Sequence, residues 1–512
     1  MSGSKSPTPD SDERYSTLLN NATAVRAICS AVESTLGPKG LDTMLVGAQG
    51  EVIITNDGVT ILDMMDVTHP AARLLIQVAK SQQKAIGDGT TTATVLASTL
   101  VQEAVDQVIR GVPVAKVIQG LTDGIRFAIQ RFRANSRIVN DTMDAHLQHI
   151  AHTAGREQSD IAELVIIAAQ RLGIDKLKES TFRFADCIIS HEQAINEVWP
   201  GIMIHHKPLQ FHTQSDVHSN RILVILDAFE PEHVNEEALV TEAGFQRHVL
   251  FQQQFQQDLQ KLAKLKVGLI IVDRSIDAEA EQYCADQGII VVQRVTRKEM
   301  HAICSYSGAK PIRKNGLHKS EVELETMLGQ CDTIMYDPDV ERIRLSGSQQ
   351  HPQVTIIVGA TTKEVVGERA RIAKDAAAAV QAAIRGGFLP GGGSAEFAVA
   401  RELDEYRMNI KGMEGFGIDV VAKALRKPLI QIVTNAGYNP LEKSEEVKSA
   451  QMVNDSDAIG IDCETGQLAD FIKSGILDPT DVKIHALTAA GEVATAIMRI
   501  HTVIKMKSKT QE

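Results

Sequence analysis

The chain has 512 residues, of which 43% are hydrophobic and 23% charged, the composition of an ordinary folded protein of two or three domains. Its formal net charge is -12 at pH 7, and no run of Lys or Arg offsets it, so nucleic acid is not an expected partner. Aromatic residues make up only 4%, which predicts an aliphatic core and argues against a base-stacking surface.

The cysteines and the N-terminal stretch indicate the cellular compartment of the protein. The six cysteines lie far apart and form no CxxC pair, which argues against a zinc cluster or a redox motif. The N-terminal stretch MSGSKSPTPDSDERYS is polar and lacks the apolar core of a signal peptide. No stretch reaches the ~18 apolar residues of a membrane span. We therefore expect a cytoplasmic protein without a membrane partner, with a disordered tail over residues 1–16.

The pattern of hydrophobic residues changes along the chain. Residues 20–137 are typical of long helices, interrupted by one hairpin at 45–55. Residues 206–348 instead alternate helical stretches with short β-branched and aliphatic runs, which predict an α/β layer with buried strands. These runs are RILVIL (221–226), VGLIIV (267–272) and GIIVVQ (288–293). Helical patterns then return until the end, which indicates a chain that leaves a helical domain, builds two further domains and comes back.

One long polar segment, 236–264, lies within the α/β region. It is rich in glutamine and has a single apolar stripe at helical spacing. The stripe consists of Leu250, Phe251, Phe255, Leu259 and Leu262. Two interpretations stay open: an ordinary surface helix of the α/β domain, or a protruding arm whose stripe contacts a neighbour or a client.

A glycine turn at 87–92, GDGTTT, precedes a good amphipathic helix. The N-terminus of a helix offers free N–H groups and the positive end of its dipole, and threonine hydroxyls add donors, so the turn predicts a phosphate cradle. Asp88 inside the turn would repel a bare phosphate but suits Mg²⁺ bound to one. The alternative is a plain helix cap. No GxxxxGK[ST] motif occurs, so the turn is not a Walker A loop.

Two further glycine clusters and two aspartates accompany this turn. TLGPKG (35–40) ends a helical run, because Pro38 cannot continue it. Gly391, Gly392 and Gly393 open a second helix, and three consecutive glycines suit a place where backbone lies against a ligand. Asp57 and Asp375 lie beside glycine-rich elements and are candidates to orient an attacking water, although each is also a common capping or solvated residue.

These motifs together resemble a known family. TLGPKG, EVIITNDGVTIL, HPAA, VAKSQ, GDGTTTATVLA, RIAKDA, LPGGG and GILDPTDVK follow one another in the order found in the chaperonins, the ATP-driven folding chambers. The resemblance covers essentially the whole folded chain. Its mixture of motifs is similar to group II chaperonins, the thermosome and TCP-1 type, and in places to the bacterial group I type, a combination that resembles the bacterial group III branch.

The resemblance implies a multidomain α+β fold. A mainly helical equatorial ATP-binding domain would comprise 17–137 and 389–512, and a small α/β intermediate hinge domain 138–205 and 349–388. An α/β apical substrate-binding domain, 206–348, would carry a helical lid protrusion at about 236–264.

The resemblance also assigns roles within a site for ATP or ADP with Mg²⁺. Asp88 would bind the metal, and Asp57 and Asp375 would activate the hydrolytic water. The residues expected to hold the nucleotide are Thr35, Leu36, Gly37, Pro38, Gly89, Thr90, Thr91, Thr92, Gly392 and Asp478. One departure is Arg156, in AHTAGRE, where group II members have a lysine that senses the γ-phosphate, so that role is open here.

The function implied is that of an ATP-dependent chaperone that encloses unfolded proteins and promotes their folding by hydrolysing ATP. A single subunit cannot enclose a client, so two stacked rings, of eight subunits each by resemblance, are expected, with a built-in lid and no separate co-chaperonin. The first alternative is a ring-forming holdase or scaffold with little ATP turnover. The second, a small-molecule ATPase or kinase, would need a further set of acid and base residues that the sequence does not offer.

Overall fold

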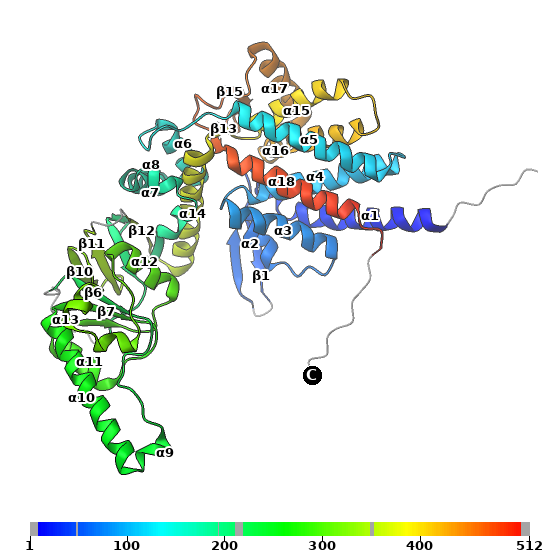
Figure 1. Ribbon diagram of the computed structural model, residues 1–512. Helices are drawn as coiled ribbons and strands as arrows, with labels where there is room; N and C mark the ends of the chain where they lie inside the picture. Colours follow the sequence, from blue (N-terminus) through cyan, green and yellow to red (C-terminus); the bar gives the residue numbers. More distant parts are fainter. Residues whose placement is uncertain (1–8, 48–49, 193, 210–218, 349–352, 503–512) are drawn as a thin grey trace, which may run out of the picture. The chain divides into compact units, whose positions relative to one another are not determined.

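The computed structural model describes residues 9–47, 50–192, 194–209, 219–348 and 353–502. The chain divides into two compact units (Figure 1). The first comprises Met1–Ile166, Ser180–Ala185 and Ile372–Glu512, and the second Ile167–Glu179 and Asp186–Arg371. The finer division into three domains stays a prediction. Of the expected tail 1–16, residues 1–8 lie outside the described residues, and a helix begins at Pro9.

The first unit is mainly helical. Its elements before the second unit are α1 (Pro9–Ser30), η1 (Glu33–Thr35), β1 (Thr43–Val46), β2 (Val52–Thr55), α2 (Gly58–Met64), α3 (Pro70–Ala85), α4 (Thr90–Ile109), α5 (Val114–Asn135) and α6 (Ala145–Ala154). Those after it are β13 (Phe388–Pro390), α15 (Ser394–Met408), α16 (Gly415–Asn435), α17 (Pro440–Asn454), β14 (Ile459–Ile461), β15 (Leu468–Asp470), β16 (Leu477–Pro479) and α18 (Thr480–Met498). Three elements contain residues of both units: α7 (Ser159–Leu172), η2 (Phe184–Cys187) and α14 (Lys363–Gly386).

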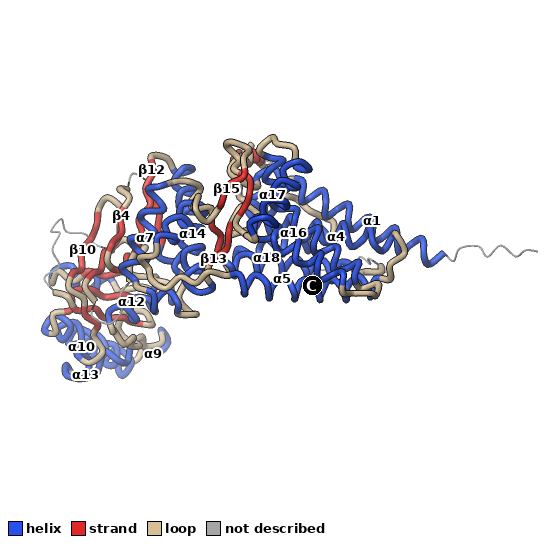
Figure 2. Tube along the Cα trace, turned by 90° about the horizontal axis from the view of Figure 1, so that it is seen from above, coloured by secondary structure: helices blue, strands red, loops and turns tan. Residues whose placement is uncertain are grey.

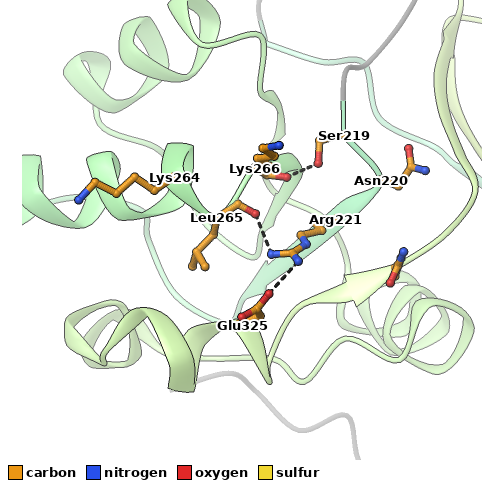
Figure 3. Close-up of a pocket in the computed structure, with 8 residues that line it drawn as sticks. Ser219, Asn220, Arg221, Lys264, Leu265, Lys266 and Glu325 are labelled. Carbon is orange, nitrogen blue, oxygen red and sulfur yellow. Dashed lines mark hydrogen bonds and ion pairs between the residues drawn. The ribbon is translucent and has the colours of Figure 1, made fainter.

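The core of the first unit joins segments from both ends of the chain. Helix α18 packs against α3, α4 and α5, and α16 packs against α4 and α5. Figure 1 shows α18 in red among these blue and cyan helices, and Figure 2 shows α4, α5, α16 and α18 side by side. Their contact surfaces are aliphatic, with Val95, Leu425 and Leu487 buried in one cluster. The pairing of β13 with β16 adds a second connection among the C-terminal elements.

The second unit is an α/β assembly. Its helices are α8 (Ile174–Lys178), α9 (Glu236–Leu239), α10 (Glu242–Lys264), α11 (Ala278–Asp286), α12 (Arg297–Ser307) and α13 (Glu321–Glu325), with η3 (Lys314–His318). Its strands are β3 (Ile188–Glu192), β4 (Glu197–Trp199), β5 (Gly201–Ile204), β6 (Arg221–Ile225), β7 (Val267–Val272), β8 (Ile290–Val292), β9 (Gly329–Gln330), β10 (Thr333–Asp337), β11 (Arg342–Ser346) and β12 (Thr355–Ala360).

The central sheet has the strand order β8-β7-β6-β9, with parallel pairing except at β9. Both faces of β7 are covered. Ile270 and Val272 pack on one side with residues of α10, whereas Leu269 and Ile271 pack on the other side with residues of α12. The predicted α/β layer with buried strands is confirmed, and burial on both faces explains why VGLIIV is continuously apolar instead of alternating.

The long polar segment forms two helices, α9 and α10. Thr241 separates them because its hydroxyl accepts the Gly244 N–H at 3.1 Å and caps α10. The second half of the apolar stripe, Phe255, Leu259 and Leu262, packs on the central sheet. The first half does not, and Leu250 is 63% exposed. The surface-helix interpretation therefore holds for the second half of the stripe, and a contact of the first half with a neighbour or a client stays a prediction.

Two smaller three-stranded sheets complete the second unit. Their strand orders are β10-β11-β5 and β3-β12-β4. The single tryptophan, Trp199 on β4, donates its indole N–H to the Leu345 carbonyl at 3.1 Å and stacks under Arg344. Among the described helices of the chain, none combines the length and apolar character needed to cross a membrane.

Candidate nucleotide site

The GDGTTT turn opens α4 in the first unit. Gly89 is the N-cap, with φ of +76°, and a β-carbon there would lie 2.6 Å from Val482 Cγ1, so only glycine fits. The first hydrogen bond of the helix runs from the Ala93 N–H to the Gly89 carbonyl at 3.0 Å. The N–H groups of Thr90, Thr91 and Thr92 precede it and stand at the positive end of a 20-residue helix. This arrangement can hold an anion.

Asp88 lies in the same turn and accepts the Gly89 N–H at 2.6 Å. Burial raises the pKa of this carboxyl to about 6, and the negative charge of Asp478 contributes to the same shift. Arg156 and Lys483 act in the opposite direction. Asp88 therefore stands beside one further carboxylate and two cations that come from distant parts of the sequence.

Gln82, on α3, holds the GDGTTT turn through hydrogen bonds of its side chain. Its side chain is fully buried, and Nε2 donates to the carbonyls of Asp88 at 2.7 Å and Val482 at 3.2 Å. Its Oε1 is 2.7 Å from Nδ1 of His485 on α18. The amide thus joins three segments and satisfies polar groups that burial would otherwise leave costly. Motif reasoning did not single out Gln82, although it ends the VAKSQ motif.

Asp57 caps α2 and is buried. Its Oδ2 accepts the Thr60 N–H at 3.0 Å and the Thr60 hydroxyl at 2.5 Å, which fixes the carboxylate. A β-carbon on the next residue, Gly58, would lie 2.5 Å from Thr91 Oγ1. The start of α2 therefore touches the start of α4. Asp57 is both a cap and a neighbour of the GDGTTT turn, so the two interpretations of its sequence position are compatible.

Asp375 lies on α14, on the segment of that helix that belongs to the first unit, and is partly buried. A β-carbon on Gly87 would lie 2.7 Å from the Ala378 β-carbon, so α14 touches the turn one helical turn after Asp375. Residues three apart share a helix face, and the side chain of the earlier one leans toward the N-terminus. Asp375 is thus on the face of α14 that meets the turn.

Arg156 follows α6 and reaches the same region. Its guanidinium donates to the side chain of Asn56, the neighbour of Asp57, and its charge lowers the pKa of Asp88. An arginine here is fixed beside two of the expected functional aspartates. Arg156 is therefore not a freely solvated side chain, and its sensing role stays a prediction.

The TLGP turn lies on the last turns of α16. Asn435 Nδ2 donates to the carbonyls of Glu33 at 2.9 Å and Leu36 at 2.8 Å, and Gly37 lies against Ile432. The Thr35 hydroxyl donates to the Val32 carbonyl at 2.8 Å, so its proton is used inside the turn. Pro38 follows Gly37 and is exposed.

The glycine cluster formed by Gly391, Gly392 and Gly393 also lies on α16. A β-carbon on Gly393 would be 2.5 Å from the Leu429 backbone nitrogen. Gly392 lies against Phe471, and a β-carbon on Gly391 would be 3.1 Å from Asp478 Oδ1. Asp478 itself is on β16, opposite Leu389. The TLGP turn and the glycine cluster thus meet through α16, whereas Asp57, α14 and α18 lie next to the GDGTTT turn.

Two charged residues near this site were not anticipated. Lys483 Nζ lies 2.7 Å from Asp478 Oδ2 and 2.8 Å from Glu396 Oε1. Burial alone would lower the pKa of Lys483, but the carboxylates of Asp478 and Glu396 together raise it above its usual value. The sequence offered only a weak signal, since Lys483 closes the GILDPTDVK motif and Glu396 is 87 positions earlier.

Comparison with known proteins identifies the family. The sequence model of the TCP-1/cpn60 chaperonin family matches residues 28–508. The thermosome subunit alpha of Thermoplasma acidophilum is 31% identical over 96% of this chain and 92% of its own length. A thermosome subunit of Pyrococcus abyssi is 30% identical with the same coverage.

A solved structure agrees with these relatives. The crystal structure of a group III chaperonin in the open state is 40% identical, covers 96% of this chain and 100% of its own, and superposes with a TM-score of 0.88. The predicted fold class and the predicted likeness to the thermosome type with a group III character are thereby confirmed, and the holdase alternative is not favoured. The chain belongs to the TCP-1/cpn60 chaperonin family and is an ATP-dependent, ATP-hydrolysing chaperonin.

Proposed function

We propose that the nucleotide binds across three glycine-rich segments: the GDGTTT turn, the TLGP turn and the cluster of Gly391, Gly392 and Gly393. The observation that carries the proposal is the meeting of Asp57, Arg156, α14 and α18 around Asp88, although these segments are far apart in sequence. The phosphates would contact Gly89, Thr90, Thr91 and Thr92, and Thr35, Leu36, Gly37 and Pro38 would line the phosphates and the sugar. Gly392 would pack near the ribose, and Asp478 would contact the ribose or the base.

A Mg²⁺ ion fits the residues present. The pKa of Asp88 is raised chiefly by burial and then by Asp478, so a cation bound at this carboxylate would favour its ionised form. Among the described residues no three His, Cys, Asp or Glu side chains are grouped as a metal site. That suits Mg²⁺, which takes one or two carboxylates together with phosphate oxygens and water. When bound to Asp88, the ion would neutralise charge on the phosphates.

Asp57 and Asp375 approach the turn from opposite neighbours, α2 and α14. The Asp57 carboxylate is held by Thr60, which suits a group that orients a water molecule at a fixed position. Asp375 would accept the proton of that water as it attacks the terminal phosphate. Arg156, fixed by Asn56, would sense that phosphate as a delocalised charge instead of the compact ammonium of a lysine.

Self-association into two stacked rings of eight subunits is part of the proposal. Exposed apolar side chains on the β1–β2 hairpin support it, since a two-stranded hairpin with such a surface gains stability from a partner. These side chains are Met44, Val46, Val52 and Ile54. The rings would act on unfolded proteins in the cytoplasm.

The α9–α10 arm is proposed as a built-in lid, without a separate co-chaperonin. Val240, Phe245 and Leu250 are 89%, 59% and 63% exposed, an apolar surface that a neighbouring arm would cover in a closed chamber. Replacing all three with Ser leaves the buried half of α10 intact. The triple variant should hydrolyse ATP yet fail to protect a refolding client from protease, and unchanged protection would contradict the lid.

Steady-state ATP hydrolysis tests the site. Asp57→Ala and Asp375→Ala should each lower kcat by about 100-fold or more, the usual contribution of a group that moves a proton or orients the nucleophile. Asp63→Ala is the matched control, because Asp63 is on the same helix as the Asp57 cap and is 60% exposed. Unchanged turnover in both site variants would contradict the assignment. Electron micrographs with and without ATP test the rings.

A further inference from the structure

Lys483 and Glu396 are the most buried ion pair near the proposed nucleotide site among the described residues. Lys483 lies in the first turn of α18, and its side chain is only 3% exposed. The ammonium contacts both oxygens of Glu396, at 2.8 and 2.9 Å, and Asp478 Oδ2 at 2.7 Å. Glu396 is also 3% exposed, whereas Asp478 is 31% exposed. The buried ammonium of Lys483 therefore pairs with one buried carboxylate, Glu396, and one accessible carboxylate, Asp478.

A buried lysine needs a reason, because removing an ammonium from water is costly unless its partners are excellent. Glu396 alone would neutralise the charge. A second carboxylate, Asp478, leaves the cluster with net negative charge. The cluster thus has one more carboxylate than a neutral structural pair, and that carboxylate, Asp478, is accessible and lies beside Gly391 of the glycine cluster.

The two oxygens of Asp478 have different surroundings. Oδ2 is occupied by Lys483. Oδ1 lies 3.1 Å from the point where a β-carbon on Gly391 would stand, and among the described residues no donor is bonded to it. The missing side chain of Gly391 leaves space in front of this oxygen. An acceptor directed at such a space suits a hydroxyl donor of a ligand.

The residue before Lys483 connects α18 to the other side of the site. The Val482 carbonyl accepts Gln82 Nε2 at 3.2 Å, and the same amide donates to the Asp88 carbonyl at 2.7 Å. The first turn of α18 therefore holds both the phosphate turn and Asp478 in one arrangement.

We propose that Lys483 is a positioning residue for nucleotide binding. By holding Oδ2 of Asp478 it directs Oδ1 at a ribose hydroxyl of ATP or ADP. Glu396 in turn holds Lys483. The inference deepens the proposed function and rests on it, because it requires a nucleotide whose sugar reaches Asp478.

The discriminating measurement compares nucleotides that differ only in the sugar. We expect wild-type protein to bind ADP about ten-fold more tightly than 2′-deoxy-ADP or 3′-deoxy-ADP, for whichever hydroxyl contacts Oδ1, since a hydrogen bond to a charged group is lost. In Lys483→Met, and likewise in Asp478→Asn, that ratio should fall to about one while ADP binding weakens about ten-fold.

A second variant separates positioning from folding. Lys483→Met alone leaves Glu396 as an uncompensated buried charge and lowers Tm. Lys483→Met with Glu396→Gln removes both charges, so Tm should recover while the sugar preference stays lost. Lys423→Met, which breaks the Lys423–Glu103 pair between α16 and α4, is the matched control and should keep both affinity and preference.

The outcomes are distinguishable. Recovery of the sugar preference in the double variant, or its persistence in Lys483→Met, would overturn the positioning role while the nucleotide site stands. Equal affinity of wild type for ADP and both deoxy analogues would also overturn it, because Asp478 would then contact no hydroxyl. Wild-type protein that neither binds nor hydrolyses ATP would instead refute the proposed function itself.

Discussion

Each unit of the chain contains a buried acid paired with a lysine, and the two clusters differ in the space beside them. In the first unit, Glu396 and Lys483 are closed off, but their third member, Asp478, is 31% exposed beside a glycine cluster. In the second unit, Asp258 is fully buried, bound by Lys261 at 2.6 Å and by His318 Nδ1 at 2.7 Å. A buried ion cluster marks a site only where one of its members also faces a space that a ligand can fill.

The cluster around Asp258 has a structural task. Lys261 also donates to the Leu317 carbonyl at 2.9 Å, so the network joins α10 to η3 at the base of the arm. His318 is 38% exposed, but the cavity that it lines together with Asp258 has a volume of only about 10 Å³, which is no more than a single water molecule needs. We therefore expect its removal to change stability and not nucleotide chemistry.

The largest expected effect is that of Asp258→Ala. Breaking a buried pair leaves Lys261 and His318 without their acid, and the free energy of unfolding of the second unit should fall by about 3 kcal/mol. Trp199 lies in that unit, so its fluorescence reports the transition in denaturant. ATPase activity in native buffer should be unchanged, and Asp286→Ala, at the end of α11, is the control. A large loss of nucleotide affinity would erase the contrast between the clusters.

The next effect depends on pH and concerns the first unit. Since the pKa of Asp88 is raised to about 6, chiefly by burial, its carboxylate becomes protonated as the pH falls through 6. Mg²⁺ requires the ionised form, so Mg²⁺-dependent ADP binding should weaken about ten-fold by pH 5, where an ordinary aspartate would still be charged.

Two variants sharpen this pH dependence. Asp478→Asn removes a negative neighbour and should move the midpoint to lower pH, whereas Lys483→Met removes a cation and should move it to higher pH. Titrations of Mg²⁺ against ADP binding at several pH values measure both shifts. Shifts in the same direction would contradict the charge arrangement around Asp88.

A smaller effect is expected for His318→Ala. The variant removes one hydrogen bond to buried Asp258 but leaves Lys261 in place, so stability should fall by about 1.5 kcal/mol. Trp199 fluorescence again provides the measurement. A loss equal to that of Asp258→Ala would mean that Lys261 does not compensate the acid.

The smallest effect is expected at an exposed pair, Lys423–Glu103. The lysine is 45% exposed and the glutamate 27%, so solvent screens their attraction. Lys423→Met should lower stability by about 0.5 kcal/mol or less, as hydrogen exchange of α16 and α4 can report. A loss of stability close to that of Asp258→Ala would contradict the expectation that exposed ion pairs stabilise this chain much less than buried ones.

Local patterns predicted much of this molecule because they report local physics. VGLIIV became a strand with the predicted bounds, and the hairpin expected at 45–55 formed as β1 and β2. The GDGTTT turn was recognised because its glycines and threonines act through the adjacent backbone. The break between α9 and α10 was not predicted, since a single Thr241 cap decides it.

Long-range partners escaped prediction for a physical reason. Gln82 meets His485, and Lys483 meets Glu396, through packing that no single segment encodes. A lysine or glutamine in a helix is ordinarily a surface residue, and only the folded core reveals that these two are buried. The roles proposed for Asp57, Asp375 and Asp478 remain predictions until the variants are measured.

The joining of both chain ends in one core also has a consequence for synthesis. Helix α18 supplies part of the hydrophobic cluster that contains α4, so the core of the first unit is incomplete until α18 has left the ribosome. The second unit ends at Arg371 and has its central sheet complete earlier. Domains generally fold as their residues emerge. The second unit of this chaperonin would thus be folded while the first unit still waits for α18.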